Sequence, residues 1–177
     1  DAEAEIAAII STLKLMSEVK VVRRWNQPVA KQAPKWLAPE LQLEVAKREV
    51  AVVAIGASTG GPAIILQILS SLSADFPVPI LVVQHISAGF TVGFAEWLHT
   101  ASGLPVNIAQ GGEVPLPGHV YVPPDDRHLR VGPMGKLQTV LDGPRHSMRP
   151  SVGVLFQSVA ERFGRRSIGV LLTGMGR

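Results

Sequence analysis

Two kinds of apolar pattern alternate along most of the chain. Unbroken apolar runs rich in β-branched residues predict buried strands, and apolar residues spaced three or four apart predict helices that cover a sheet. The strands are expected at residues 50–55, 78–84, 104–110 and 167–174, and the helices at 62–72, 90–102 and 151–163. Strands that alternate with helices of roughly ten residues are typical of βαβ units with right-handed crossovers. The pattern therefore predicts an α/β fold with a doubly wound, mostly parallel, Rossmann-like sheet.

Residues 118–144 depart from this alternation. They read "GHVYVPPDDRHLRVGPMGKLQTVLDGP", in which short alternating runs are separated by "GPMG". Short runs joined by a turn that contains glycine and proline are typical of an antiparallel hairpin. We therefore expect a hairpin that is inserted into the parallel sheet or appended to it.

The beginning of the chain is organised differently. Residues 3–18 place isoleucine, leucine and methionine at helical spacing behind several early acidic residues, which predicts an amphipathic helix. Residues 26–40 contain several prolines and show no periodicity, as linkers do. We therefore expect an N-terminal helix with a Pro-containing linker over residues 1–48 and a catalytic domain over residues 49–177.

The stretch "VVAIGASTGGPA", residues 52–63, is a glycine-rich loop between a predicted strand and a predicted helix. It does not fit the dinucleotide-binding pattern GxGxxG, because Ser58 stands where the second glycine belongs. It is not a P-loop either, because Pro62 follows Gly61 where a lysine is required. Residues 56–60 fit GxSxG, the nucleophile elbow, in which a sharp strand-to-helix turn exposes a serine. The alternative is an ordinary turn whose serine caps the helix.

Ser58 is thus the candidate nucleophile, and it needs a base. His85 follows the strand predicted at 78–84, one βαβ unit further along the chain. Since parallel strands end at the same edge of a sheet, where open α/β sheets build their sites, we expect His85 to lie near Ser58. The N–H groups of the helix that follows Thr59 would face a developing oxyanion. The alternative for His85 is a hydrogen-bonded structural role.

Composition argues against several other classes of function. A net charge of +3 and an aromatic content of 5% are low for a nucleic-acid groove, so we expect no nucleic-acid partner. The absence of cysteine excludes disulfides and thiolate catalysis and indicates a reducing, cytoplasmic location. The histidines form no HExxH motif, no apolar run is long enough to span a membrane, and the acidic start is unlike a signal peptide. We therefore expect no metal, no cofactor and no membrane insertion.

Five blocks of the sequence carry a specific resemblance. In chain order they are "AIGASTGGP", "VVQHISAGFT", "LPGHVYVPPDDRHL", "RPSVGVLFQSVA" and "GVLLTGMG". Together they resemble the catalytic domain of the chemotaxis protein-glutamate methylesterases, the CheB family. The resemblance implies a serine hydrolase that demethylates glutamyl γ-methyl esters on the cytoplasmic domain of methylated chemoreceptors, and that also deamidates glutamines. The helical segment before the linker resembles the tail that joins this domain to an upstream receiver domain.

The resemblance also implies roles for individual residues. Ser58 matches the family nucleophile and His85 its general base. Met175 matches the residue whose backbone N–H helps to stabilise the oxyanion, and we assign Arg149 and His146 to substrate binding. Where the family commonly has "RPSVD", this chain has "RPSVG", so a carboxylate near the substrate cleft is missing.

A second departure concerns the acid of the triad. In the family this acid follows the "TGMG" block directly, and the sequence ends at Arg177, before that position. Nothing in the sequence positions of Asp125 and Asp126 recommends them as substitutes. We therefore expect residues 1–177 to be a C-terminally incomplete catalytic unit with negligible activity of its own. The alternative function is a non-catalytic signalling or docking module that retains the fold.

Overall fold

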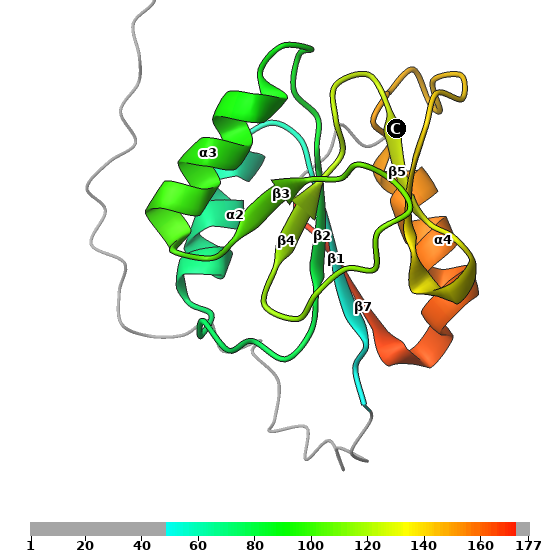
Figure 1. Ribbon diagram of the computed structural model, residues 1–177. Helices are drawn as coiled ribbons and strands as arrows, with labels where there is room; N and C mark the ends of the chain where they lie inside the picture. The colour runs from blue at the N-terminus through cyan, green and yellow to red at the C-terminus, as the bar shows by residue number, and fades with distance from the viewer. Residues whose placement is uncertain (1–48, 173–177) are drawn as a thin grey trace, which may run out of the picture. The chain divides into compact units, whose positions relative to one another are not determined.

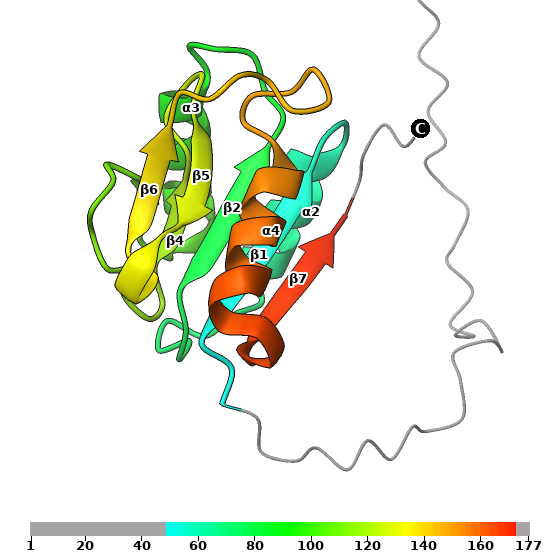
Figure 2. The same cartoon turned by 90° about the vertical axis from the view of Figure 1, so that its right-hand side faces the viewer.

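A computed structural model describes residues 49–172 of the chain, and within them a five-stranded parallel sheet is the central element. Its strand order is β3-β4-β2-β1-β7, and every neighbouring pair is parallel. The strands are β1 (Val52–Ala57), β2 (Ile80–Gln84), β3 (Val106–Ile108), β4 (Val120–Val122) and β7 (Ser167–Leu171). Figure 2 shows β2, β1 and β7 side by side and pointing towards the same edge. The predicted parallel α/β sheet is confirmed.

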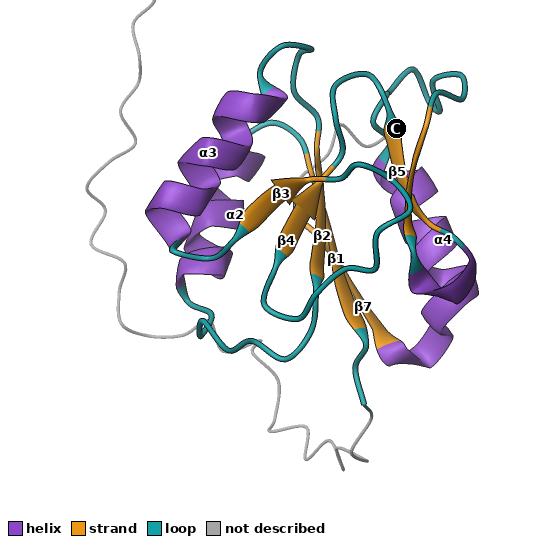
Figure 3. Ribbon diagram, viewed as in Figure 1, coloured by secondary structure: helices purple, strands orange, loops and turns teal. Residues whose placement is uncertain are grey.

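Helices cover both faces of this sheet, as Figures 1 and 3 show. Helices α2 (Gly61–Ser70) and α3 (Thr91–Ser102) lie on one face, and α4 (Val152–Phe163) lies on the other. Two short 3-10 helices, η1 (Pro133–Gly135) and η2 (Gly164–Arg166), complete the list of helical elements in the described residues. The predicted helices at 62–72, 90–102 and 151–163 therefore form, with ends shifted by a residue or two.

Strand β1 divides the core into two layers. Val53, Ile55 and Ala57 pack into the cluster that contains the buried side chains of α2 and α3. Val52 and Ala54 pack into the cluster on the α4 side. Successive side chains of a strand point to opposite faces, so a strand covered on both faces reads as an unbroken apolar run. This is why the pattern at 50–55 was such a strong strand signal.

The predicted hairpin is present but shorter than the irregular stretch suggested. Strands β5 (His128–Val131) and β6 (Leu137–Val140) pair antiparallel across η1 and form a separate two-stranded sheet. Their apolar side chains join the core cluster on the α4 side. Residues 120–122, at the start of the same stretch, instead form β4 and lie between β3 and β2 in the parallel sheet.

Several sequence-based expectations lie outside the described residues. They are the N-terminal helix at residues 3–18, the linker at 26–40 and the loop that contains Met175. These expectations stay predictions.

The close contact between β1 and α4 leads to a stability prediction. A Cβ atom added to Gly56 would overlap Cγ1 of Val152 and lie 2.9 Å from its Cγ2. Valine is β-branched and cannot swing away within its preferred rotamer, so we expect Gly56→Ala to lower the free energy of unfolding by roughly 1–3 kcal/mol. Urea unfolding followed by circular dichroism would measure the change.

Gly93→Ala is the matched control. Gly93 lies within α3, and an added Cβ would meet nothing within 4 Å. Alanine has the higher helix propensity, so this substitution should be neutral or stabilising by up to about 1 kcal/mol. Equal stability of the Gly56→Ala protein and the wild type would show that β1 and α4 are not packed so closely.

Candidate active site

Ser58 directly follows β1, at the turn that leads into α2. Its carbonyl oxygen accepts a hydrogen bond from the Gly61 N–H at 2.8 Å, which closes the turn. Gly60 has a φ of 77° and is the N-cap of α2, so Ser58 does not occupy the capping position. Pro62, near the start of the helix, removes an N–H that would have no partner inside the helix. The local structure is therefore a sharp strand-to-helix turn of the kind that presents a serine.

His85 directly follows β2, the neighbour of β1. Its backbone N–H donates to the Ala57 carbonyl at 3.0 Å, so the residues after the two strands remain in register. Burial disfavours the imidazolium form and lowers the pKa of His85 below its ordinary value of 6.5. Its Nε2 is buried and has no hydrogen-bond partner among residues 49–172. The lowered pKa favours the neutral imidazole, and its Nε2 is not engaged by the described residues.

Gln84 ties the two candidates together through their backbones. Its Nε2 donates to the Ser58 carbonyl at 2.8 Å and to the His85 carbonyl at 3.0 Å. The side chain is 5% exposed, and Gly61 leaves room for its Oε1, which an added Cβ would overlap. No sequence motif marks Gln84 as part of the site, although a glutamine at the end of the apolar run "ILVVQ" is a visible signal.

Ser58 and His85 line one cavity. It has a volume of about 330 Å³, and its other lining residues are Ile86, Ser87, Met148, Arg149 and Pro150. The loop after β2 thus supplies one wall and the loop before α4 supplies the other. The structure thus brings Ser58, His85 and Arg149 to one cavity, and their chemical roles stay predictions.

Arg149 is held by the carboxylate of Asp126, a residue whose position in the sequence indicates no role in the site. Its Nε and Nη2 donate to the two carboxylate oxygens of Asp126, each at 2.7 Å, and its Nη1 donates to the Asp142 carbonyl at 3.1 Å. The hydrogen bond from Arg149 is the main cause that lowers the pKa of Asp126. The guanidinium at the cavity wall is therefore charge-balanced.

Thr59 and His146, two other predicted site residues, are not among the residues that line this cavity. Thr59 is exposed beside Ser58 in the turn and is not one of the lining residues. His146 is exposed in the loop before α4, has a φ of 52° and does not line the cavity either. Met175 lies outside the described residues. The roles of these three residues stay predictions.

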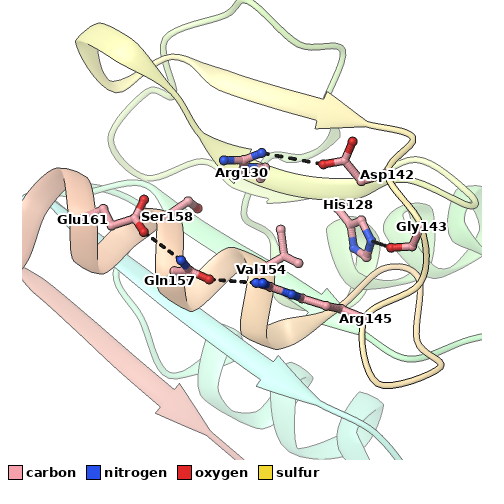
Figure 4. Close-up of a pocket in the computed structure, with 9 residues that line it drawn as sticks. All are labelled: His128, Arg130, Asp142, Gly143, Arg145, Val154, Gln157, Ser158 and Glu161. Carbon is pink, nitrogen blue, oxygen red and sulfur yellow. Dashed lines mark hydrogen bonds and ion pairs between the residues drawn. The ribbon is translucent and has the colours of Figure 1, made fainter.

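A second cavity, of about 280 Å³, lies between the β5–β6 hairpin and α4 (Figure 4). Its polar groups pair with one another: Arg130 lies 3.7 Å from Asp142, and Gln157 connects Arg145 to Glu161 through two hydrogen bonds of 2.8 Å. In the same wall, His128 accepts from the Ser151 N–H through Nδ1 and donates from Nε2 to the Gly143 carbonyl. These bonds anchor the loop that carries Arg149. The polar residues around this cavity therefore have a structural role.

Comparison with known proteins agrees with the geometry. The family model described as CheB methylesterase matches residues 53–177. The crystal structure of the Thermotoga maritima CheB methylesterase catalytic domain is similar, with a TM-score of 0.68 and 39% sequence identity, over 72% of this chain and 69% of that chain. The similarity therefore extends over both the fold and the sequence.

Two curated relatives match along the whole chain. A protein-glutamate methylesterase/protein-glutamine glutaminase of Nitrosospira multiformis is 49% identical over 178 residues, which are 100% of this chain and 50% of that protein. Protein-glutamate methylesterase/protein-glutamine glutaminase 4 of Myxococcus xanthus is 49% identical over 177 residues, with the same coverage. The chain thus spans about half the length of the curated relatives it matches. The chain belongs to the CheB methylesterase family.

Proposed function

We propose that this chain carries the catalytic centre of a serine hydrolase that demethylates glutamyl γ-methyl esters of chemoreceptors. The observation that carries the proposal is that Ser58 and His85 follow neighbouring parallel strands and line one cavity. A serine beside a neutral histidine is the nucleophile-and-base pair of acyl-transfer enzymes. The names of the relatives support both the substrate class and a second reaction, the deamidation of glutamine, since either reaction passes through a glutamyl acyl-enzyme.

The proposed reaction has two halves. Ser58 Oγ attacks the ester carbonyl carbon while His85 takes the hydroxyl proton. The backbone N–H of Met175 and the first turn after Thr59 stabilise the oxyanion, and Arg149 and His146 contact the substrate around it. As the intermediate collapses, the bond to the methoxy oxygen breaks and His85 returns the proton, so that methanol leaves. Water, deprotonated by His85, then attacks the acyl carbon. The bond to Ser58 Oγ breaks, His85 returns the proton to that oxygen, and the glutamate leaves as a carboxylate once its acid proton passes to solvent.

A protein substrate fits the surface beside this cavity. A neighbouring, mostly apolar cavity of about 550 Å³ shares Ile86 and Ser87 with it and extends along α3 to Phe90, Phe94 and Trp97. Phe90 is 67% exposed. Exposed aromatic side chains next to a catalytic cavity are suited to the apolar side of a receptor helix. This surface favours a polypeptide over a small ester as the substrate.

Two further elements of the proposal concern the complete protein. Its substrate would be the cytoplasmic domain of a receptor, so we expect the protein to act in the cytoplasm. Separately, none of the helices in residues 49–172 could span a membrane. A receiver domain upstream of this chain is compatible with relatives about twice as long as the part that matches.

A serine-directed fluorophosphonate separates the proposed hydrolase from a non-catalytic module. The complete natural protein should be labelled at Ser58, located by peptide mass spectrometry, and should release methanol from a methylated receptor fragment. An inert Ser58 together with absent methanol release would support the docking module instead.

The lowered pKa of His85 predicts how the reaction depends on pH. Only the neutral imidazole accepts a proton, and a lower pKa keeps it neutral in more acidic solution. We therefore expect kcat/KM to rise with pH through a midpoint below 6.5 and to level off above it. Methanol release measured from about pH 4.5 to 8.5 tests this. A midpoint above 7 would show that the pKa of His85 is set by a group outside residues 49–172.

A further inference from the structure

We propose that Asp125 and Asp126 form a brace that holds the two walls of the Ser58 cavity, and that Asp126 also balances the charge of Arg149 so that the cavity favours neutral substrates over the carboxylate product. We call the two residues the aspartate brace. The inference rests on the proposed function and adds positioning and specificity-determining residues to it.

The brace starts at the same edge of the sheet as the site. Asp125 and Asp126 belong to the loop after β4. Strand β4 is hydrogen-bonded to β2 on the side opposite β1. Because the strands are parallel, this loop leaves the sheet beside the loop that carries His85. Asp126 has a φ of 55°, a left-handed conformation that aspartate tolerates better than most residues. The two carboxylates bind different parts of the chain.

Asp125 holds the wall that follows β2. One carboxylate oxygen accepts from the Gly89 N–H at 2.9 Å, and the other accepts from the Thr91 hydroxyl at 2.5 Å. Gly89 lies near the end of the loop that begins at His85, and Thr91 is the first residue of α3 and is buried. Both ends of this wall are therefore fixed, at His85 by the sheet and at Gly89 by Asp125. The position of Phe90, between the two bonded residues, is fixed as well.

Asp126 holds the opposite wall through Arg149. The two parallel N–H···O bonds of 2.7 Å form a bidentate pair, the strongest and most directional arrangement available to arginine and a carboxylate. Arg149 lies between Met148 and Pro150, and all three residues line the Ser58 cavity. The orientation of this wall thus depends on a carboxylate from another loop.

The charge of this pair has a consequence for specificity. The proposed substrates, a γ-methyl ester and a glutamine amide, are neutral, whereas the common product is a carboxylate. An unbalanced guanidinium at the cavity wall would attract that product and slow its release. Asp126 occupies two donors of Arg149 and cancels its charge, so the cavity gains no net attraction for the product.

Hydrogen exchange measured by mass spectrometry tests the brace without relying on activity. Asp125→Asn should speed exchange in residues 85–90, and Asp126→Asn should speed it in residues 145–150, each on the order of tenfold and without affecting the other segment. Glu96→Gln, an exposed carboxylate on α3 that does not line the cavity, is the matched control and should change neither segment. If Asp125→Asn fails to fold, Thr91→Val removes one of its two donors with little change in shape.

Binding of a receptor fragment tests the charge argument. Titration calorimetry with the demethylated fragment, which carries free glutamate, should show about fivefold tighter binding to the Asp126→Asn protein than to the wild type. The gain should disappear in the Arg149→Gln/Asp126→Asn double variant, since the attracting cation is gone. For hydrolysis of the ester, Asp126→Asn should raise KM by about threefold and change kcat less.

The outcomes separate the two proposals. Segment-specific exchange and tighter product binding in a protein that hydrolyses no ester would overturn the proposed function and keep the brace. Normal ester hydrolysis with unchanged exchange in both segments would overturn the brace. Unchanged product binding in the Asp126→Asn protein would overturn the charge-balancing role of Asp126.

Discussion

Replacing Ser58 with alanine is expected to lower ester hydrolysis by about a thousandfold or more in the complete natural protein. Without the hydroxyl no acyl-enzyme forms, and only binding and oxyanion stabilisation are left. The fold should persist, because the substitution leaves in place the Ser58 carbonyl, which accepts two of the bonds that hold this turn. They come from the Gly61 N–H and from Gln84 Nε2, each at 2.8 Å. Methanol release from a methylated receptor fragment measures the loss, and circular dichroism checks the fold.

Ser87→Ala is the informative control, because Ser87 is the other serine that lines the same cavity. Ser87 is not the serine of a GxSxG turn, so its replacement should lower the rate of ester hydrolysis by less than about tenfold. A folded Ser58→Ala protein that turns over at a near-normal rate would rule out the serine mechanism. A thousandfold loss in the Ser87→Ala protein instead would identify Ser87, in the loop after β2, as the nucleophile.

The strands and helices were predictable where burial imposed a pattern. All six residues of β1 and all five of β2 are buried, so both strands appear as apolar runs in the sequence. Residues 120–122 were harder to place, because a three-residue strand is too short to show a period. These residues form β4, which pairs with β2 and β3 through contacts between segments that are separate in the sequence. A local pattern cannot report such pairing.

The candidate site was predictable to the same extent. Ser58 and His85 could be placed because each follows a recognisable strand, and parallel strands bring their ends together. The sequence positions of Asp125 and Asp126 do not indicate their partners, which are Gly89 and Thr91 for Asp125 and Arg149 for Asp126. Those partners lie 34 and 36 residues away for Asp125 and 23 residues away for Asp126. The sequence of two adjacent aspartates in a loop does not indicate which groups they will bind.

Replacing His85 with glutamine is the second change that should remove most of the activity. Glutamine cannot accept the Ser58 proton or return it to the leaving methoxy oxygen, so we expect a loss of about a thousandfold or more. The backbone bonds of this position, from the His85 N–H to the Ala57 carbonyl and from Gln84 Nε2 to the His85 carbonyl, do not need the imidazole. Methanol release and thermal unfolding would be measured together. His99→Gln, an exposed histidine on α3, is the control and should act close to the wild type.

The double variant decides whether His85 acts through Ser58. If the two residues work as one unit, removing either disables both, and Ser58→Ala/His85→Gln should be no slower than the slower single variant, within about threefold. Their backbones are already joined by Gln84, which binds both carbonyls, so the structure provides for a unit of this kind. Losses that multiply in the double variant would contradict this expectation. They would show that His85 contributes independently of the nucleophile, as a substrate-binding group would.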